Sequence, residues 1–212
     1  LTEHTFVHTG QNSAPTLNDV FFRDLNLRAP DHYLGVDTSS IGAVMGETLE
    51  KTEKLLSDVR PDAVLILGDT NSAIAAIIAE RMQIPVYHME AGNRSFDANV
   101  PEELNRRMVD HVASFNLPYN DFSMRNLLSE GIHPRRISKT GSPIREIFIK
   151  NKEAILSSDI LGRLGLEKQS YVLASVHRQE NVDFPKRLAA IVACLQAVQT
   201  QFQLPVLVST HP

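Results

Sequence analysis

Short apolar runs alternate along the chain with longer segments of helical spacing. The apolar runs are too short for a typical helix and end at turn or polar residues; they lie at residues 5–9, 63–67, 86–88, 115–117, 137–140, 171–176 and 205–209. The segments of helical spacing lie at residues 17–25, 42–59, 71–82, 122–130, 144–164 and 184–202. A continuous apolar run such as residues 63–67 is typical of a strand buried on both faces. Strands that alternate with helices in this way predict βαβ units, and therefore an α/β fold with parallel sheets.

The alternation divides the chain into three parts. Residues 1–145 carry most of an α/β domain, residues 146–168 form a charged helical connector interrupted near Ser157 and Ser158, and residues 169–212 begin a second α/β domain. The chain starts with Leu rather than Met and stops where an apolar strand leads into a loop, so we expect truncation at both ends.

Composition excludes several classes of protein. The chain has 212 residues, 42% of them hydrophobic and 22% charged, which excludes disordered and low-complexity classes. The formal charge of −4, from 21 Lys and Arg against 25 Asp and Glu, argues against a broad surface for nucleic acid or an anionic membrane. No run reaches the roughly 20 apolar residues of a membrane-spanning helix. We therefore expect a globular protein with a small-molecule partner.

The single cysteine, Cys194, lies in an apolar stretch of a helical segment. One cysteine cannot form an intrachain disulfide, and a small buried thiol is the simplest interpretation of its surroundings. This cysteine usage favours a reducing, cytoplasmic setting.

Polar residues follow three of the predicted strands, at the edge where an open parallel sheet binds ligands. Asp69 follows residues 63–67, Glu90 follows residues 86–88, and the pair His177-Arg178 follows residues 171–176. Asp69 could equally be a helix N-cap that accepts free backbone N–H groups. Glu90 has no strong structural use beside Gly92, which favours a role in a site.

The other candidate groups each have a structural and a functional interpretation. Glu102 follows Pro101 in the first turn of a predicted helix, where an acidic residue complements the helix dipole and an i,i+4 pair with Arg106 is possible. His177 and Arg178 can hold a phosphate, or form a surface pair beside a turn. His88 lies within a strand, where a hydrogen-bonded core histidine is the commoner case. The remaining histidines lack metal-ligand spacing, so we assign no metal.

Several signatures of nucleotide enzymes and hydrolases are absent. The sequence contains no Gly-x-x-x-x-Gly-Lys-Ser/Thr loop, no Gly-x-Gly-x-x-Gly run and no Gly-x-Ser-x-Gly elbow. ATPase, conventional dinucleotide-enzyme and α/β-hydrolase interpretations therefore lose most of their support.

The strand-end motifs resemble those of one enzyme family. Leu-Gly-Asp-Thr-Asn-Ser, His-Met-Glu-Ala-Gly-Asn-Arg, Val-Pro-Glu-Glu-Leu-Asn-Arg-Arg, Thr-Gly-Ser-Pro and His-Arg-Gln-Glu-Asn occur at residues 67–72, 88–94, 100–107, 140–143 and 177–181. In this order and spacing they resemble the non-hydrolysing UDP-N-acetylglucosamine 2-epimerase family. The residues at 71–72 and 92–94 are most similar to the branch that epimerises UDP-2-acetamido-2,6-dideoxy-L-talose for capsule or O-antigen.

The resemblance implies a fold and a reaction. The family has two Rossmann-like domains in the glycosyltransferase-B arrangement, so this chain would lack the first strand of the N-terminal domain and carry an incomplete second domain. The family inverts C2 of a UDP-N-acetylhexosamine by eliminating UDP to give a glycal-like intermediate and then re-adding it. This chemistry needs an acid/base group on each face of the sugar and donors on the leaving diphosphate. No cofactor is implied; a homodimer is.

Residue roles carry over only at matching motifs. Asp69, Glu90 and Glu102 resemble the family's three essential carboxylates. Asp69 and Glu90 would be the acid/base groups nearest the sugar, and Glu102 a supporting or proton-relaying carboxylate. His177 resembles its diphosphate-contacting histidine, and Arg178 an accessory phosphate or regulatory-site contact. Gln11 aligns with a segment that contacts a second, regulatory UDP-N-acetylglucosamine in some members, but so short a match does not carry that regulation over.

Other interpretations remain open from the sequence. They are the hydrolysing branch, which releases UDP and free N-acetylmannosamine, a non-catalytic nucleotide-sugar-binding module, and a glycosyltransferase, which shares the two-domain architecture. The family's N-terminal Gly-Thr-Arg-Pro-Glu loop and its later Ser-Gly-Gly segment are not in these residues. We therefore expect the 212 residues alone to be inactive.

Overall fold

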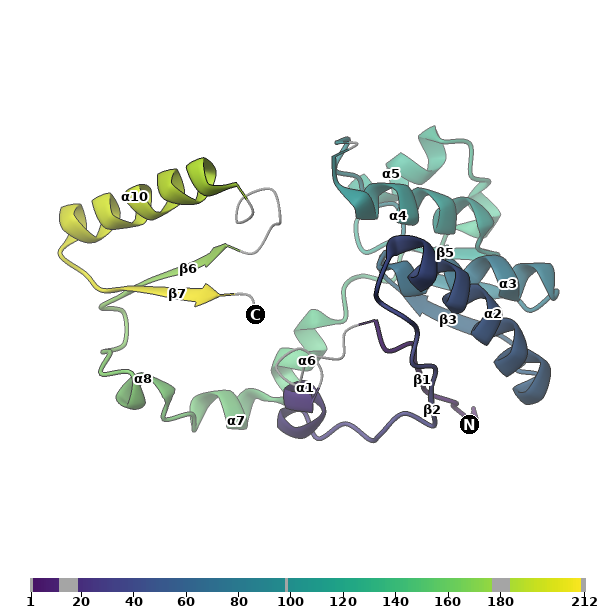
Figure 1. The fold of residues 1–212 in the computed structure, drawn as a ribbon, viewed down its shortest axis with the longest axis horizontal. Helices are drawn as coiled ribbons and strands as arrows, with labels where there is room; N and C mark the ends of the chain where they lie inside the picture. The colour runs from purple at the N-terminus through teal and green to yellow at the C-terminus, as the bar shows by residue number, and fades with distance from the viewer. Residues whose placement is uncertain (1, 12–18, 98, 177–183, 211–212) are drawn as a thin grey trace. The chain divides into compact units, whose positions relative to one another are not determined.

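The structure is a computed structural model that describes residues 2–11, 19–97, 99–176 and 184–210 (Figure 1). Contacts divide the chain into two compact units, Leu1–Glu146 and Ile147–Pro212. Among the described residues every strand pairing is parallel. The prediction of an α/β fold with parallel sheets is therefore confirmed.

The first unit contains five strands and most of the helices that the structure describes. Its strands are β1 (Val7–His8), β2 (His32–Tyr33), β3 (Val64–Leu67), β4 (Val86–Met89) and β5 (Phe115–Leu117). Its helices are α1 (Asp19–Asp24), α2 (Ile41–Val59), α3 (Ala75–Arg81), α4 (Pro101–Val112) and α5 (Asp121–Ser129), with 3₁₀ turns η1 (Asn71–Ile74) and η2 (Pro134–Arg136). Helix α6 (Ile144–Lys150) reaches the boundary between the units.

Strands β3, β4 and β5 form one sheet in that order, and β1 pairs separately with β2. Ile66 of β3 and Val86 of β4 pack against Leu56 of α2, Ala76 of α3 and Val109 of α4. These apolar side chains lie on one face of the sheet, so the three helices cover that face and close the main core. Since burying apolar area is the dominant favourable term in folding, this packing fixes the position of the sheet edge.

The opposite face of β3 is more open than the sequence predicts. Leu65 and Leu67 are 63% and 61% exposed. The prediction that residues 63–67 are buried on both faces is wrong, because in the described part of the unit the helices α2, α3 and α4 pack on the Ile66 side.

Other local predictions differ from the structure in short segments. The helix expected over residues 71–82 begins as the tighter turn η1 before α3, as is frequent at helix N-termini. Residues 137–140 make only an isolated bridge, between Ile137 and Asn116. The strand β2 was not predicted because His32 and Tyr33 are both exposed and carry no apolar pattern.

The second unit contains a parallel pair of strands and one long helix. Helices α7 (Lys152–Leu156) and α8 (Ile160–Arg163) precede β6 (Val172–Val176), α10 (Pro185–Phe202) and β7 (Val206–Thr210). The break predicted near Ser157 and Ser158 lies between α7 and α8. Strand β6 pairs in register with β7, and α10 lies along this pair (Figure 1).

Cys194 lies on α10 and is exposed, so the prediction of a buried thiol is wrong. The reason is that α10 has no buried residue, since the described part of this unit offers it only a two-stranded sheet. No helix among the described residues is long and apolar enough to cross a membrane.

Candidate active site

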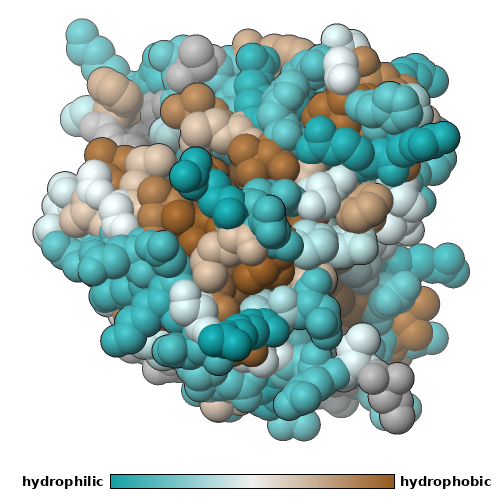
Figure 2. Space-filling model, turned by 90° about the vertical axis from the view of Figure 1, so that its right-hand side faces the viewer, coloured by the Kyte–Doolittle hydropathy of each residue, from teal (hydrophilic) through white to brown (hydrophobic). Residues whose placement is uncertain are grey.

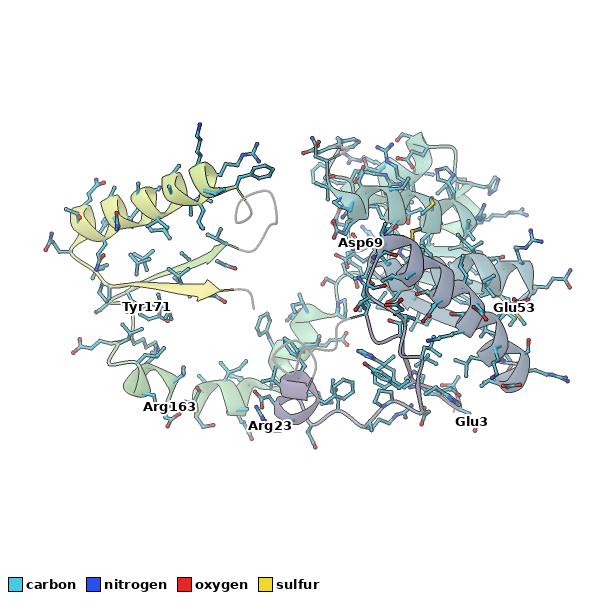
Figure 3. All side chains as sticks on the ribbon, in the orientation of Figure 1. Glu3, Arg23, Glu53, Asp69, Arg163 and Tyr171 are labelled. Carbon is cyan, nitrogen blue, oxygen red and sulfur yellow. The ribbon has the colours of Figure 1, made fainter. Side chains whose placement is uncertain are left out.

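Two of the predicted site residues meet at one edge of the sheet. Asp69 follows β3 and Glu90 follows β4, and the last residues of these strands, Leu67 and Met89, are register partners. A Cβ atom built on Gly68 would lie 3.5 Å from Oε2 of Glu90, so the Glu90 carboxyl lies over the turn that carries Asp69. Figure 3 labels Asp69 at this end of the first unit. The structure thus brings both carboxyl groups to the edge where open parallel sheets bind ligands.

Asp69 is held by an arginine that the sequence did not single out for this role. Its Oδ2 accepts hydrogen bonds from Nε of Arg106 at 2.9 Å and from Nη2 at 2.6 Å. The N-cap of η1 is Thr70, with no side-chain capping bond, so the interpretation of Asp69 as an N-cap is wrong. The amide of Asn105 donates to the Asp69 carbonyl and to Oδ1 of Asn71, both at 3.0 Å. Helix α4 therefore fixes both the backbone and the carboxylate of Asp69.

Glu90 adopts an unusual backbone conformation. Its φ is +66°, in the left-handed region that costs a non-glycine residue about 1–3 kcal/mol. Such a conformation persists only where the surrounding structure holds it. Asn93 donates from Nδ2 to Oε1 of Glu90 at 3.1 Å.

The surroundings of Glu90 favour its protonated form. Burial is the main cause that raises its pKa, followed by the negative charge of Asp69, while Arg106 and His88 act in the opposite direction. Asp69, by contrast, forms an ion pair with Arg106. Two neighbouring carboxyl groups in such different environments are suited to separate acid and base roles.

Glu102 is not drawn into the contacts that join Asp69 and Glu90. It lies in the first turn of α4 and is exposed, and its side chain has no hydrogen bond or ion pair with any described residue. The possible pair between Glu102 and Arg106 is absent, since Arg106 binds Asp69 and Glu103 instead. Residues four apart share one face of a helix, so Glu102 lies on the side of α4 that presents Arg106 to Asp69.

Glu103 is the buried member of the acidic pair. It accepts hydrogen bonds from Arg106 at 3.0 Å, from Arg107 at 3.1 Å and from the Ser95 N–H at 2.9 Å. Burial works to raise the pKa of Glu103, but the Ser95 and arginine donors outweigh it and lower the pKa. Glu103 therefore serves to hold Arg106 and the loop before α4.

The rule that ligands bind at the carboxyl ends of parallel strands also points to a residue that the sequence analysis missed. Tyr119 comes two residues after β5, at the same edge as Asp69 and Glu90, and is half-buried. Burial, and then the negative charge of Glu90, raise the pKa of its phenol group. Applying the rule to residues 115–117 as well as to the other strands would have found Tyr119.

Two further predicted residues are not located. His177 and Arg178 lie outside the described residues, so the predicted phosphate-binding pair has no structural description. In the part of the chain that the structure describes, no group of three or more His, Cys, Asp and Glu side chains is arranged to hold a metal ion.

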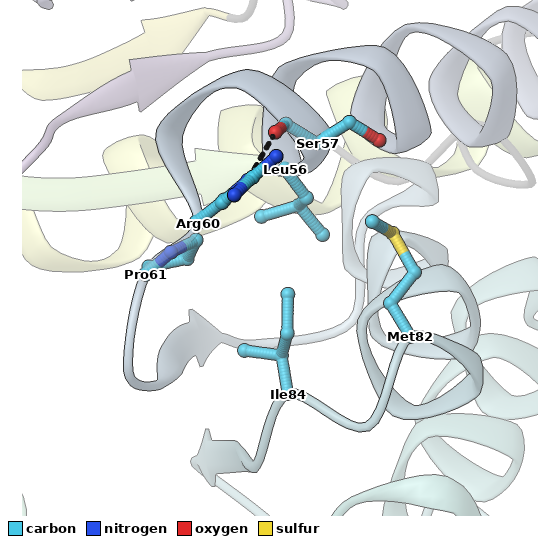
Figure 4. Close-up of a pocket in the computed structure, with 6 residues that line it drawn as sticks. All are labelled: Leu56, Ser57, Arg60, Pro61, Met82 and Ile84. Atoms are coloured by element: carbon cyan, nitrogen blue, oxygen red, sulfur yellow. Dashed lines mark hydrogen bonds between the residues drawn. The ribbon is translucent and has the colours of Figure 1, made fainter.

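A groove of about 370 Å³ lies at the other end of the sheet, lined by Leu56, Ser57, Arg60, Pro61, Met82 and Ile84 (Figure 4). Pro61 and Ile84 precede β3 and β4, so the groove is at the amino ends of these strands. Figure 2 views the side on which α2 ends, where hydrophobic residues gather among hydrophilic ones. Because ligands of open parallel sheets bind at the carboxyl ends, this groove is not the candidate site.

The sequence and the fold match known proteins. The family described as UDP-N-acetylglucosamine 2-epimerase matches residues 2–212. The chain is 33% identical over 210 residues to UDP-2,3-diacetamido-2,3-dideoxy-D-glucuronate 2-epimerase of Pseudomonas aeruginosa, covering 97% of this chain and 58% of that protein. It superposes with a TM-score of 0.90 and 41% identity on UDP-N-acetylglucosamine 2-epimerase from Rickettsia bellii, covering 100% of this chain and 55% of that one.

A second solved structure is the Methanocaldococcus jannaschii enzyme in complex with UDP-GlcNAc and UDP, with a TM-score of 0.87 and 33% identity over 97% of this chain and 57% of that one. The chain therefore spans little more than half the length of the proteins it matches. The family match extends over the carboxylate-bearing strand ends and both units. On this evidence the chain belongs to the UDP-N-acetylglucosamine 2-epimerase family.

Proposed function

We propose that the complete protein is a non-hydrolysing 2-epimerase that inverts C2 of a UDP-N-acetylhexosamine. The observation that carries the proposal is the pair of carboxyl groups at one sheet edge, Asp69 bound to Arg106 and Glu90 favoured in its protonated form. The family match supports the reaction class. The bound ligands named for the M. jannaschii structure, UDP-GlcNAc and UDP, support a nucleotide sugar as substrate.

In one direction Asp69 accepts the C2 proton while the C1–O bond breaks and the electron pair leaves with UDP. The products of this step are a glycal-like intermediate and UDP. Glu90 then donates a proton to the opposite face of C2, and a UDP oxygen re-forms the bond to C1. In the reverse direction the two carboxyl groups exchange roles.

The remaining predicted residues support this chemistry. Glu102, on the Arg106 side of α4, relays protons between the solvent and the acid/base pair. His177 and Arg178 bind the diphosphate, because imidazolium and guanidinium donors stabilise the negative charge that develops on a leaving phosphate.

The substrate pair is UDP-GlcNAc and UDP-ManNAc, or the 6-deoxy-L-talo and L-fuco pair suggested by the residues at 71–72 and 92–94. The named substrate of the P. aeruginosa relative, a UDP-linked diacetamido sugar acid, supports a role in cell-surface polysaccharide such as capsule or O-antigen. We place the enzyme in the cytoplasm and expect a homodimer.

An NMR time course of the complete protein in deuterated water tests the reaction. With the correct UDP-sugar, deuterium should enter C2 while both epimers keep their bond to UDP. Release of UDP with free N-acetylmannosamine would instead identify a hydrolysing enzyme. Binding of UDP-sugars without any exchange at C2 would identify a non-catalytic module.

Isosteric variants test the acid/base pair. Asp69→Asn and Glu90→Gln should each lower the rate of C2 exchange by about 10²–10⁴-fold, the usual contribution of a positioned acid or base. Asp58→Asn and Glu53→Gln, two exposed positions on α2, provide controls of the same chemical change. Exchange at the wild-type rate in either site variant would refute the assignment.

A further inference from the structure

A buried ionic network lies behind the two catalytic turns, which are residues 68–69 after β3 and residues 90–92 after β4. At its centre is Asp110 of α4, whose side chain is 0% exposed. Its Oδ2 accepts a hydrogen bond from Nη1 of Arg94 at 2.7 Å, and both carboxylate oxygens accept from the Gly92 N–H at 3.1–3.2 Å. On its other side Arg94 makes a two-pronged contact with Glu130, the C-cap residue of α5, at 2.7 Å and 2.6 Å. These groups are not used by the acid/base chemistry proposed above.

His88 joins the same network through both of its ring nitrogens. Its Nδ1 lies 2.8 Å from Oδ1 of Asp110, and its Nε2 lies 2.9 Å from the carbonyl oxygen of Gly68. Both neighbours are hydrogen-bond acceptors. A neutral imidazole has one donor nitrogen and one acceptor nitrogen. In a neutral ring the lone pair of the acceptor nitrogen would therefore face a lone pair of the oxygen beside it, in the protein interior. An unmade hydrogen bond there is costly, and a ring with a hydrogen on each nitrogen avoids it.

A positive His88 matches the second negative charge of the network, whose exposed end also includes His111, with its Nε2 3.2 Å from Oε2 of Glu130. Asp110 and Glu130 are then matched by Arg94 and His88. Although burial works to lower it, the hydrogen bonds of Glu130 and Asp110 raise the pKa of the Arg94 guanidinium. The hydrogen bond from Arg94 in turn lowers the pKa of Glu130. A buried charge left without its partner would be strongly destabilising.

The network contacts both catalytic turns. The His88 ring holds the Gly68 carbonyl, in the peptide just before Asp69, and its backbone lies two residues before Glu90. Asp110 holds the Gly92 N–H two residues after Glu90. The positive charge of His88 also works to lower the pKa of Glu90, against the effects of burial and Asp69. One pair of side chains thus fixes the flanks of Asp69 and of Glu90.

We infer that His88 is an imidazolium and that His88 and Asp110 are positioning residues that hold Asp69 and Glu90 at their working separation. The charge state of His88 is independent of what the protein catalyses. The positioning role rests on the proposed epimerase function.

NMR of the complete protein with ¹⁵N-labelled histidine tests the charge state directly. Both ring nitrogens of His88 should carry a hydrogen at neutral pH, because each faces a hydrogen-bond acceptor. The resonances are assigned by their absence in His88→Gln. A His88 ring with one hydrogen-free nitrogen at neutral pH would overturn the inference, whether or not the protein is an epimerase.

Asp110→Asn tests the positioning role while keeping the shape of the side chain. The new amide should donate to His88 and leave one ring nitrogen without a hydrogen. The turns that carry Asp69 and Glu90 should loosen, and kcat should fall about 100-fold, as expected when a catalytic group is misplaced by about 1 Å. KM should change far less. If this variant does not fold, the same kinetic measurement on His88→Gln decides the positioning role.

The matched control is Glu80→Gln on α3. The Glu80 carboxylate accepts from the Ser114 hydroxyl and from the Val86 N–H at 3.2 Å, at the amino end of β4 and away from the site. This control should lose stability but keep its kcat. If kcat falls equally in Asp110→Asn and Glu80→Gln, the network is merely structural and the positioning role is refuted. A wild-type protein without C2 exchange refutes the proposed function and with it the positioning role, while the NMR result still decides the charge of His88.

Discussion

At the scale of single residues, the site depends on the contrast between two carboxyl groups of similar chemistry. Asp69 meets a guanidinium that is only 15% exposed, whereas Glu90 meets an amide, Asn93, and the charge of Asp69. A single conformational feature, the positive φ of Glu90, turns its carboxyl over Gly68.

The raised pKa of Glu90 predicts how Glu90→Gln changes stability with pH. A raised folded-state pKa means that Glu90 favours folding when protonated, and that this contribution is lost as pH rises through the folded-state pKa. A neutral glutamine avoids the loss. The variant should therefore melt at a higher temperature than wild type at about pH 7, and the difference should vanish below about pH 4, near the ordinary pKa of glutamate.

Calorimetry at several pH values measures this difference. Glu102→Gln is the control, because Glu102 is exposed and without a described partner, so its effect should stay within about 0.5 kcal/mol. A Glu90→Gln protein that is less stable than wild type at neutral pH would contradict the prediction.

Sequence reasoning located the residues whose role depends on strand ends and missed those whose role depends on packing. Asp69 and Glu90 follow from the rule that ligands bind at the carboxyl ends of parallel strands. The different roles of Glu102 and Glu103 do not follow, because adjacent acidic residues are equivalent until the helix face is known. Arg106 could be seen as a helix residue, but its contact with Asp69 spans 37 positions and requires the fold.

At the scale of elements, the turn after β4 is set by helix α5. Gly92 has a φ of +78°, and a Cβ atom there would lie 2.2 Å from the Ser123 carbonyl oxygen and 2.8 Å from Leu127 Cγ. Leu127 packs with Ala91 in the second apolar cluster of the unit. Gly92, which the sequence marks only as a neighbour of Glu90, is therefore a position of close packing.

Gly92→Ala should destabilise the protein by about 3 kcal/mol or more, because the left-handed φ and the overlap with α5 each cost about 1–3 kcal/mol. Chemical denaturation measures the loss. Gly46→Ala on α2 is the matched control: nothing lies within 4 Å of the added Cβ, and replacing a helix glycine should stabilise by roughly 0.5–1 kcal/mol. Equal stability of the Gly92 variant and wild type would show that α5 does not constrain this turn.

Periodicity predicted the elements that carry a continuous apolar run or stripe in the sequence. The strands β4, β6 and β7 and the long helices α2 and α10 lie within a residue or two of their predicted bounds. It failed for β2, where two polar, exposed residues form a strand only because β1 pairs with them. Residues 137–140 show the opposite case, an apolar run that forms a single bridge.

At the scale of the whole molecule, the short helices at the unit boundary and at the start of the second unit contribute little to either core. None of α6, α7 and α8 contains a buried residue, in contrast to α2, α3 and α4 of the first unit. A segment with few buried apolar contacts opens at low free-energy cost. The chain should therefore open in this segment before the rest of either unit unfolds.

Limited trypsin digestion of the 212-residue chain tests this order of opening. The first cuts should follow Lys150, Lys152 or Arg163 in the short helices. These cuts should be at least about tenfold faster than cuts after Arg81 or Arg106. A tenfold difference in cleavage rate needs a difference of only about 1.4 kcal/mol in the free energy of local opening. Arg81 and Arg106 are the internal references, since α3 and α4 pack on the main core. Mass spectrometry of the early fragments identifies the sites. A first cut after Arg81 or Arg106 would mean that the first unit opens before the short helices do, and that burial within single helices does not set the order.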